Sequence, residues 1–198
     1  MKRIGLLSDT HGYWDDRYKE YFAECDEIWH AGDIGTMELA ERLAALKPFR
    51  AVCGNCDGGD LRRMYPEVLR WSCEGADVLM KHIGGHPGAY DRSVRDLINR
   101  RPPKLFISGH SHILKVEYDK SLKLLHINPG AAGVADSAHA CKVHGRRRRI
   151  QGFGSDRDTE VIEKAHDALF LFYASVGKYA WVEGKFSNRN KPCEKYVP

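Results

Sequence analysis

Between Asp9 and His112 the chain repeatedly carries side chains that can bind a metal ion, in short clusters that also hold glycine. There are five such clusters: Asp9-Thr10-His11-Gly12, Gly32-Asp33, Gly54-Asn55-Cys56-Asp57, His82 with the nearby His86, and Gly109-His110-Ser111-His112. Any one of these residues alone is typical of a helix cap or a surface histidine. Their joint recurrence indicates a metal centre, and mixed nitrogen and oxygen ligands without an assigned thiolate favour Mn, Fe, Zn or Ni over Ca or Mg.

The number of candidate ligands points to two ions rather than one. The candidates are Asp9, His11, Asp33, Asn55, His82, His110 and His112. Two divalent ions carry four positive charges, of which Asp9, Asp33 and a bridging hydroxide would neutralise three, so the centre would attract an anion such as a phosphate ester. A pair of ions of this kind activates a bridging water for in-line attack on phosphorus. The pattern therefore predicts phosphoester hydrolysis.

Each cluster directly follows a short apolar segment, which we expect to be a buried strand. These segments cover residues 4–7, 27–30, 49–53, 78–80 and 105–108. In open α/β sheets, ligands bind in the crevice beyond the carboxyl ends of the strands, so five strand ends would bring the clusters to one place. Glycine at these ends lets the backbone crowd close to that centre.

The rest of the pattern predicts helices and hairpins around these strands. Apolar spacing predicts helices over 37–46 and 91–99, the second with Asp91 as its N-cap and Pro102 beyond its end. We expect two hairpins, which pair 68–73 with 76–82 and 113–118 with 122–127. The result is an α/β layered sandwich with helices outside.

With these motifs in this order, residues 1 to about 133 resemble the calcineurin-like metallophosphoesterase superfamily. The chain length, the form Gly54-Asn55-Cys56-Asp57 and the sequence Asn128-Pro129-Gly130 are similar to the small bacterial and archaeal phosphodiesterases, a group related to the retromer subunit of eukaryotes. The resemblance implies a four-layer fold, a two-sheet β-sandwich flanked by helices. It also implies a metal-dependent phosphodiesterase that binds two divalent ions. Mn²⁺ is the expected metal, with Zn²⁺, Fe or Ni²⁺ as alternatives.

The resemblance also implies a ligand set for each ion. One ion would be held by Asp9, His11, Asp33 and His112, and the other by Asp33, Asn55, His82 and His110, so that Asp33 bridges them. The family usually has the sequence His-Gly-His here, whereas three residues separate His82 from His86 in this chain. We assign the ligand to His82, which directly follows the predicted strand, and keep His86 as the alternative.

The proton donor stays open. Many superfamily members carry a histidine directly after the asparagine ligand, where it is thought to protonate the leaving group. Here Cys56 stands in that position. The candidates for this catalytic role are Cys56, Asp57 and His86.

Two other function classes compete with a phosphodiesterase. A non-catalytic metal-binding scaffold for protein interactions, like the retromer subunit, could lose ligands without penalty, whereas here all seven positions keep competent side chains. A nuclease would need a basic track for a phosphate backbone, but residues 1–133 carry 19 Lys and Arg against 19 Asp and Glu. We therefore expect a small phosphoester substrate and no nucleic-acid partner.

Composition places the protein in a broad class. The chain has 198 residues, 42% hydrophobic and 29% charged, which excludes a disordered or fibrous protein. No segment approaches the roughly 20 apolar residues that span a bilayer, and the N-terminus turns polar too early for a signal sequence. We expect a cytoplasmic protein without membrane contact, with its six cysteines reduced. The Cys53–Cys56 spacing lacks a second cysteine pair, so it does not indicate a redox or zinc site.

Residues 134–198 do not follow the family pattern, in which strands after the Asn-Pro-Gly sequence close the second sheet. This atypical C-terminal segment holds the whole positive excess of the chain, with 12 Lys and Arg against 8 Asp and Glu. Its apolar positions over 160–176 are those of one amphipathic helix. The segment is either an atypical extension or the product of a change in reading frame after about Gly133, and we assign it no function.

Overall fold

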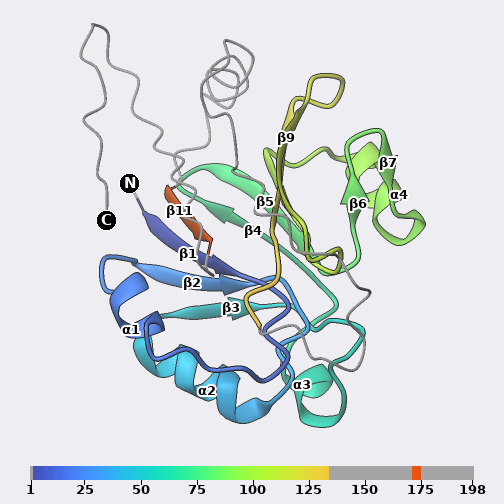
Figure 1. Cartoon of the computed structure of the whole chain (residues 1–198). Helices are drawn as coiled ribbons and strands as arrows, with labels where there is room; N and C mark the ends of the chain where they lie inside the picture. Colours follow the sequence, from blue (N-terminus) through green and yellow to red (C-terminus); the bar gives the residue numbers. More distant parts are fainter. Residues whose placement is uncertain (1, 134–170, 175–198) are drawn as a thin grey trace, which may run out of the picture.

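Two β-sheets lie face to face, with helices on their outer sides (Figure 1). The computed structural model describes residues 2–133 and 171–174. The first sheet has the strand order β11 (Leu171–Ala174), β1 (Arg3–Leu7), β2 (Glu27–His30) and β3 (Phe49–Ala51). The second sheet has the order β4 (Val68–Cys73), β5 (Ala76–Lys81), β8 (Leu105–Ile107), β10 (Leu124–Pro129) and β9 (Leu114–Asp119). A short hairpin is formed by β6 (Gly85–His86) and β7 (Ala89–Tyr90), and the helices are α1 (Tyr18–Tyr21), α2 (Met37–Leu46), α3 (Gly59–Met64) and α4 (Arg92–Arg100).

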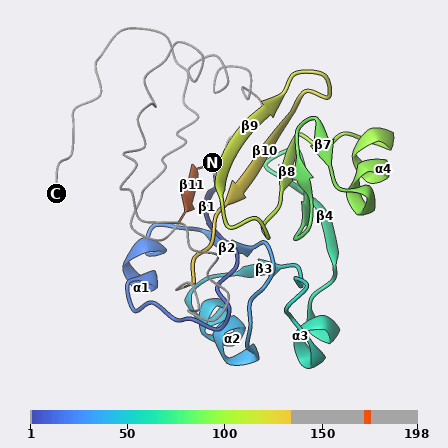
Figure 2. The same ribbon diagram turned by 45° about the vertical axis from the view of Figure 1, so that its right-hand side comes forward.

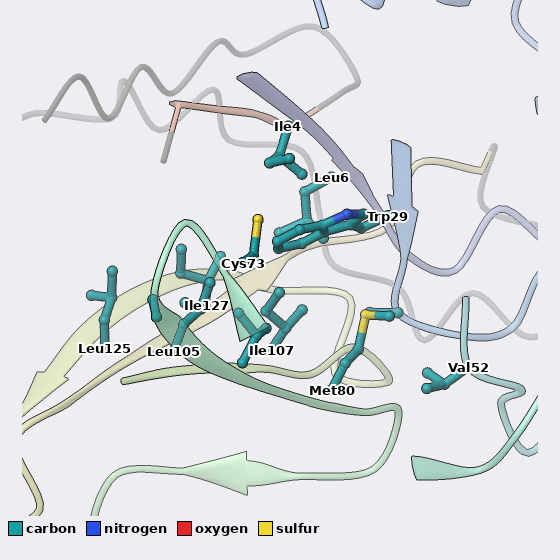
Figure 3. Packing of buried hydrophobic residues seen from close by; sticks show 13 residues of the cluster. Ile4, Leu6, Trp29, Val52, Cys73, Met80, Leu105, Ile107, Leu125 and Ile127 are labelled. Atoms are coloured by element: carbon teal, nitrogen blue, oxygen red, sulfur yellow. The ribbon is translucent and has the colours of Figure 1, made fainter. Parts of the chain in front are cut away.

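The side chains of the strands alternate between two neighbouring layers, as the two-residue repeat of a strand requires. Leu6 and Trp29 of the first sheet pack against Ile107 of the second, and Figure 3 shows Trp29 between the sheets. Phe106, the neighbour of Ile107, points the other way and packs against Val94 of α4. Figure 2 shows α4 on the side of the second sheet away from β1 and β2.

A third core lies between the first sheet and its helices. Ile28 of β2 packs with Tyr18 of α1 and with Leu39 and Leu43 of α2. The α2 residues recur at the three- and four-residue spacing that places side chains on one helix face. The order of layers is therefore helices, sheet, sheet and helix, which confirms the predicted two-sheet sandwich.

The longer predicted elements are confirmed. Helix α2 covers residues 37–46 as predicted, and both hairpins form, as β4 with β5 and β9 with β10. The side chain of Asp91 caps α4 by accepting a hydrogen bond from the backbone N–H of Ser93 (2.8 Å). The sequence pattern missed α1, α3 and the β6–β7 hairpin, because elements of two to six residues are too short to show a period.

The helix predicted over 160–176 is wrong at its C-terminal end. Residues 171–174 form β11, which pairs in parallel with β1 from Arg3↔Leu171 to Leu6↔Ala174. A short apolar segment has no period that separates a helix from a strand, and the unpaired edge of β1 offers hydrogen bonds to a strand. The other predicted features of residues 134–198 lie outside the described residues.

The strand directions explain why the clusters can meet. Strands β1, β2 and β3 run parallel to one another, and β8 runs parallel to both β5 and β10. Parallel strands of one sheet end at the same edge, so the loops after β1, β2 and β3 lie together, as do those after β5 and β8. None of the helices in the described part of the chain is long and apolar enough to cross a membrane.

Two buried histidines are expected to make stability fall in acid. Burial lowers the pKa of His30 to about 3 and that of His126 to about 4, both below the ordinary value for histidine. The unfolded chain therefore binds protons between about pH 6.5 and pH 4 that the folded protein does not, and the free energy of unfolding decreases as the pH falls through this window.

Urea unfolding of wild type and of His126→Gln at pH 6 and pH 5 tests this expectation. The free energy of unfolding of wild type should fall more steeply than that of the variant, by roughly 1 kcal/mol per pH unit. Because both proteins share every other titrating group, the difference isolates His126. Equal slopes would contradict its contribution.

Candidate metal centre

Loops at the carboxyl ends of five strands carry the candidate ligands. Asp9 follows β1, Asp33 follows β2, Asn55 follows β3, His82 follows β5, and His110 and His112 follow β8. Backbone hydrogen bonds tie these loops to one another. The N–H of Asp9 donates to the carbonyl of Gly32 (2.9 Å), the N–H of His11 to that of Asp33 (3.0 Å), and the N–H of Gly109 to that of His82 (2.9 Å).

Three groups of side chains could each hold a metal ion, because their ligand atoms lie within 4.8 Å of one another. The groups are Asp9 with His11 and His112, Asp33 with His82 and His110, and His11 with Asp33 and Cys56. The first two groups share no residue, and the third brings Asp33 together with His11 of the first group. The remaining candidate ligand, Asn55, is exposed, and its loop is held beside Asp33 because the N–H of Cys56 donates to Asp33 Oδ1 (2.8 Å).

The ring of His82 is oriented as a metal ligand would be. Its Nδ1 lies 2.8 Å from the carbonyl oxygen of Ala31. A carbonyl can only accept, so Nδ1 donates a proton to it, and in the neutral ring Nε2 presents a lone pair. This Nε2 lies 3.3 Å from Asp33 Oδ2 and 3.8 Å from Asp9 Oδ1.

Two polar atoms of this cluster are buried and lack a hydrogen-bond partner, namely His82 Nε2 and Asp9 Oδ1. An unpaired buried polar atom costs about 1–3 kcal/mol. A divalent ion bound to each of these atoms would satisfy both, and imidazole and carboxylate are suitable ligands for such ions. The residues therefore fit a metal ion.

The electrostatics of the cluster keep Asp33 ionised. Burial opposes the charge on this carboxylate, but the neighbouring His82 and the backbone N–H of Cys56 outweigh burial and hold the pKa of Asp33 well below its usual range. Burial likewise opposes the charge on His82, and the carboxylates of Asp33 and Asp9 outweigh it and raise the pKa of that histidine. Asp33 is thus an anion at neutral pH, the charge state that suits a metal ligand.

Backbone strain is concentrated at the candidate ligands. The backbone angle φ is positive at Asp9 (54°), His11 (47°), Asp33 (54°), His110 (67°) and His112 (58°). Residues with a Cβ rarely adopt this left-handed conformation, and strain of this kind costs about 1–3 kcal/mol per residue. The other two described non-glycine residues with positive φ, Glu74 and Lys123, lie in the β4–β5 and β9–β10 turns. Such clustering is typical of a functional site.

Two glycines let the loops approach this closely. A Cβ at Gly54 would lie 2.0 Å from Asp33 Oδ1, and a Cβ at Gly109 would lie 2.0 Å from Ser8 Oγ and 2.9 Å from Asp9 Oδ2. No side chain fits at these distances, so glycine is required where the loops after β3 and β8 pass the carboxylates.

The three candidate proton donors differ in position. The carboxylate of Asp57 is buried and accepts hydrogen bonds from the N–H groups of Ile34 (3.1 Å), Gly35 (2.8 Å) and Gly54 (2.8 Å), so it joins two loops of the site. His86 is exposed on β6 and belongs to none of the three groups described above. Cys56 alone lies within one of them. Partial burial and the nearby charge of Asp33 raise the pKa of its thiol to about 11.

Two positioning residues were missed by sequence reasoning. Asn128 Nδ2 donates to the carbonyl of Gly109 (2.6 Å) and to Ser111 Oγ (3.0 Å), and so holds the loop between β8 and β9. Arg62 of α3 donates from Nη2 to the carbonyl of Gly54 (2.8 Å) and from Nε to that of Asp57 (2.6 Å). Asn128 could have been found from the Asn-Pro-Gly sequence, whereas Arg62 is one of two consecutive arginines and carried no signal.

Removal of the Arg62 side chain is expected to loosen the loop that carries Asn55. Outer partners of metal ligands typically contribute 10–100-fold to metal affinity or activity. We therefore expect Arg62→Ala to weaken binding of one metal ion by roughly tenfold or more in a calorimetric titration.

The neighbouring Arg63→Ala is the matched control. Arg63 is exposed and pairs with Asp60, which lies outside the cluster. Metal affinity of this variant should equal that of wild type. If both arginine variants bind metal alike, Arg62 does not position the loop.

Comparison with known proteins agrees with this geometry. A family model described as the calcineurin-like phosphoesterase superfamily domain matches residues 1–144. A probable metallophosphoesterase of Bacillus subtilis is 32% identical over 133 residues, which cover 64% of this chain and 72% of that protein. A probable metallophosphoesterase of Methanocaldococcus jannaschii is 33% identical over 141 residues, which cover 66% of this chain and 68% of that protein.

Solved structures show the same fold. Vacuolar Protein Sorting 29 from Cryptosporidium parvum matches with a TM-score of 0.56 at 20% identity, covering 68% of this chain and 77% of that one. A novel archaeal phosphodiesterase matches with a TM-score of 0.51 at 24% identity, covering 67% and 85%. Since the family model spans most of the chain, including every candidate ligand, the chain belongs to the calcineurin-like phosphoesterase superfamily, which uses divalent metal ions.

Proposed function

We propose that this phosphoesterase is a phosphodiesterase with a dinuclear metal centre. One ion would be held by Asp9, His11, Asp33 and His112, and the other by Asp33, Asn55, His82 and His110. The observation that carries the proposal is the pair of ligand groups joined through Asp33, which has atoms within 4.8 Å of ligands on both sides. Mixed nitrogen and oxygen ligands suit Mn²⁺ first, with Zn²⁺, Fe or Ni²⁺ as alternatives.

When bound, divalent ions make a water molecule acidic enough to attack phosphorus and neutralise the charge of the phosphoryl oxygens. Residues of the chain orient the side chains that would bind these ions. The N–H of His110 donates to Asp9 Oδ2 (3.1 Å), which leaves the buried Oδ1 free, and the carbonyl of Ala31 fixes the ring of His82.

Two exposed histidines leave one half of this cluster open to a substrate. The rings of His11 and His112 are exposed, with their centroids 5.3 Å apart. Cys56 is the proton-donor candidate that the geometry favours, because its thiol lies with His11 and Asp33. The equal numbers of acidic and basic residues in 1–133 support a small phosphoester rather than nucleic acid as substrate.

The alternative of a non-catalytic interaction scaffold is less well supported. Five candidate ligands adopt a strained backbone, and each such residue costs about 1–3 kcal/mol. A surface that only docks a partner does not need these side chains to converge on buried carboxylates. A reactive centre does need its ligands to converge in this way, so the strained backbone at these residues favours catalysis.

Metal removal tests the proposal directly. Purified protein with Mn²⁺ should hydrolyse bis(para-nitrophenyl) phosphate. A chelator should abolish the reaction, because the proposed mechanism needs the metal ions to activate the attacking water. Metal analysis should find two ions per chain. Equal rates with and without chelator would refute the metal mechanism, and turnover of para-nitrophenyl phosphate alone would refute the preference for diesters.

A further inference from the structure

A pocket lined in part by charged side chains opens beside one half of the candidate centre. Its volume is about 340 Å³, and its lining includes Asn55 and His82, two proposed ligands of the same ion. The volume falls within the range of pockets that bind small molecules, at its lower end. The pocket therefore offers room, next to the reacting phosphorus, for a group about the size of a nucleoside or a sugar.

The charges along the rest of the pocket cancel. Arg62 and Lys81 supply two cations, and Glu67 and Asp91 supply two anions. Arg62 is already engaged, because it donates to Glu67 Oε1 (3.1 Å) as well as to the loop carbonyls described above. The carboxylate of Asp91 is likewise engaged in capping α4. A further anion in the pocket would gain no net attraction.

The polar groups of the lining suit hydroxyls instead. A lysine ammonium donates hydrogen bonds, a carboxylate accepts them, and a serine hydroxyl does both. Lys81 brings donors to the pocket and Glu67 an acceptor, and the Ser93 hydroxyl, which already donates to Asp91, can still accept. A ligand hydroxyl needs both a donor and an acceptor, whereas a second phosphate needs an excess of donors.

A phosphodiester carries a second organic substituent on phosphorus, which a monoester lacks. We propose that this pocket is the subsite for one arm of the diester, and that it selects an uncharged, hydroxyl-bearing arm of nucleoside or sugar size. This inference rests on the proposed function and adds a substrate class to it.

Two substrates with the same leaving group test the subsite. Thymidine 5′-(para-nitrophenyl) phosphate carries a hydroxylated, uncharged arm, and methyl para-nitrophenyl phosphate carries none. Contacts with the pocket should lower KM for the thymidine ester by about tenfold relative to the methyl ester, which corresponds to about 1.4 kcal/mol of binding. A 3′-phosphate added to the thymidine arm should remove most of this advantage, and an equal or larger advantage would refute selection of an uncharged arm.

Variants that alter the pocket provide the matched comparison. Ser93→Tyr should fill the pocket and bring the two KM values within about twofold of each other, and Lys81→Met should raise KM for the thymidine ester alone. Asp96→Tyr is the control, because Asp96 is an exposed residue of α4 that does not line the pocket, and it should keep the tenfold difference. A tenfold difference that survives in both pocket variants would refute the subsite.

A binding measurement separates this inference from the proposed function. Calorimetry on the Mn²⁺-loaded protein should show thymidine 5′-monophosphate binding about tenfold more tightly than methyl phosphate in wild type, and equally in Ser93→Tyr. Equal KM values in a chelator-sensitive reaction would refute the subsite and leave the phosphodiesterase standing. Turnover of both esters that resists chelation would refute the phosphodiesterase mechanism itself.

Discussion

Asp33→Asn is expected to abolish metal-dependent phosphoester hydrolysis, with a loss of about a thousandfold or more, equivalent to about 4 kcal/mol of transition-state stabilisation. Asp33 and His11 each belong to two of the three candidate metal groups, and Asp33 is the only carboxylate of the two. Because Asp33 is a proposed ligand of both ions, its replacement should weaken both at once. An amide removes the negative charge but can still accept the hydrogen bond from the N–H of Cys56. The fold should therefore survive while metal content falls below two ions per chain.

Asp60→Asn is the matched control for this variant. Asp60 is an exposed carboxylate of α3 whose partner is Arg63, and it belongs to none of the three groups. Its activity and metal content should equal those of wild type. An Asp33→Asn protein that retains activity within threefold of wild type would refute the bridging role.

Gly54→Ala is expected to reduce hydrolysis by at least about a hundredfold, although it adds only one methyl group. The new Cβ would lie 2.0 Å from Asp33 Oδ1 and 2.3 Å from the backbone nitrogen of Asp33. Because the second of these atoms belongs to the backbone, a side-chain rotation cannot relieve the clash. The two loops must move apart, and Asn55 moves with Gly54.

Gly58→Ala in the same loop isolates this effect. No atom lies within 4 Å of a Cβ built at Gly58, and its φ of −132° is ordinary for alanine. This control should keep its activity and its metal content, as measured by turnover and by metal analysis. If the two alanine variants are equally active, close approach at Gly54 is not required for function.

The candidate ligands could be predicted from the sequence because their signal is local. Each is a metal-competent residue just after a short apolar segment, and strands β1, β2, β3, β5 and β8 do precede them. Parallel strands end at one edge of a sheet, so residue type and chain position together implied convergence. Helix α2 and the Asp91 cap were predictable for the same reason, since three- and four-residue spacing and N-cap chemistry are properties of neighbouring residues.

Only the tertiary structure decided which polar residues lie in the candidate metal groups and which hold the loops together. Asp33 and Asp57 are the same residue type in similar Gly-rich clusters. Asp57 accepts hydrogen bonds from three N–H groups, whereas Asp33 lies with His82 and His110 in one group and with His11 and Cys56 in another. The hydrogen bonds from Arg62 to the loop after β3 and the position of β11 beside β1 were likewise unpredictable. Local residue types determine what a side chain can bind. Its partner comes from another loop, so the assignment depends on contacts between distant segments that no local pattern encodes.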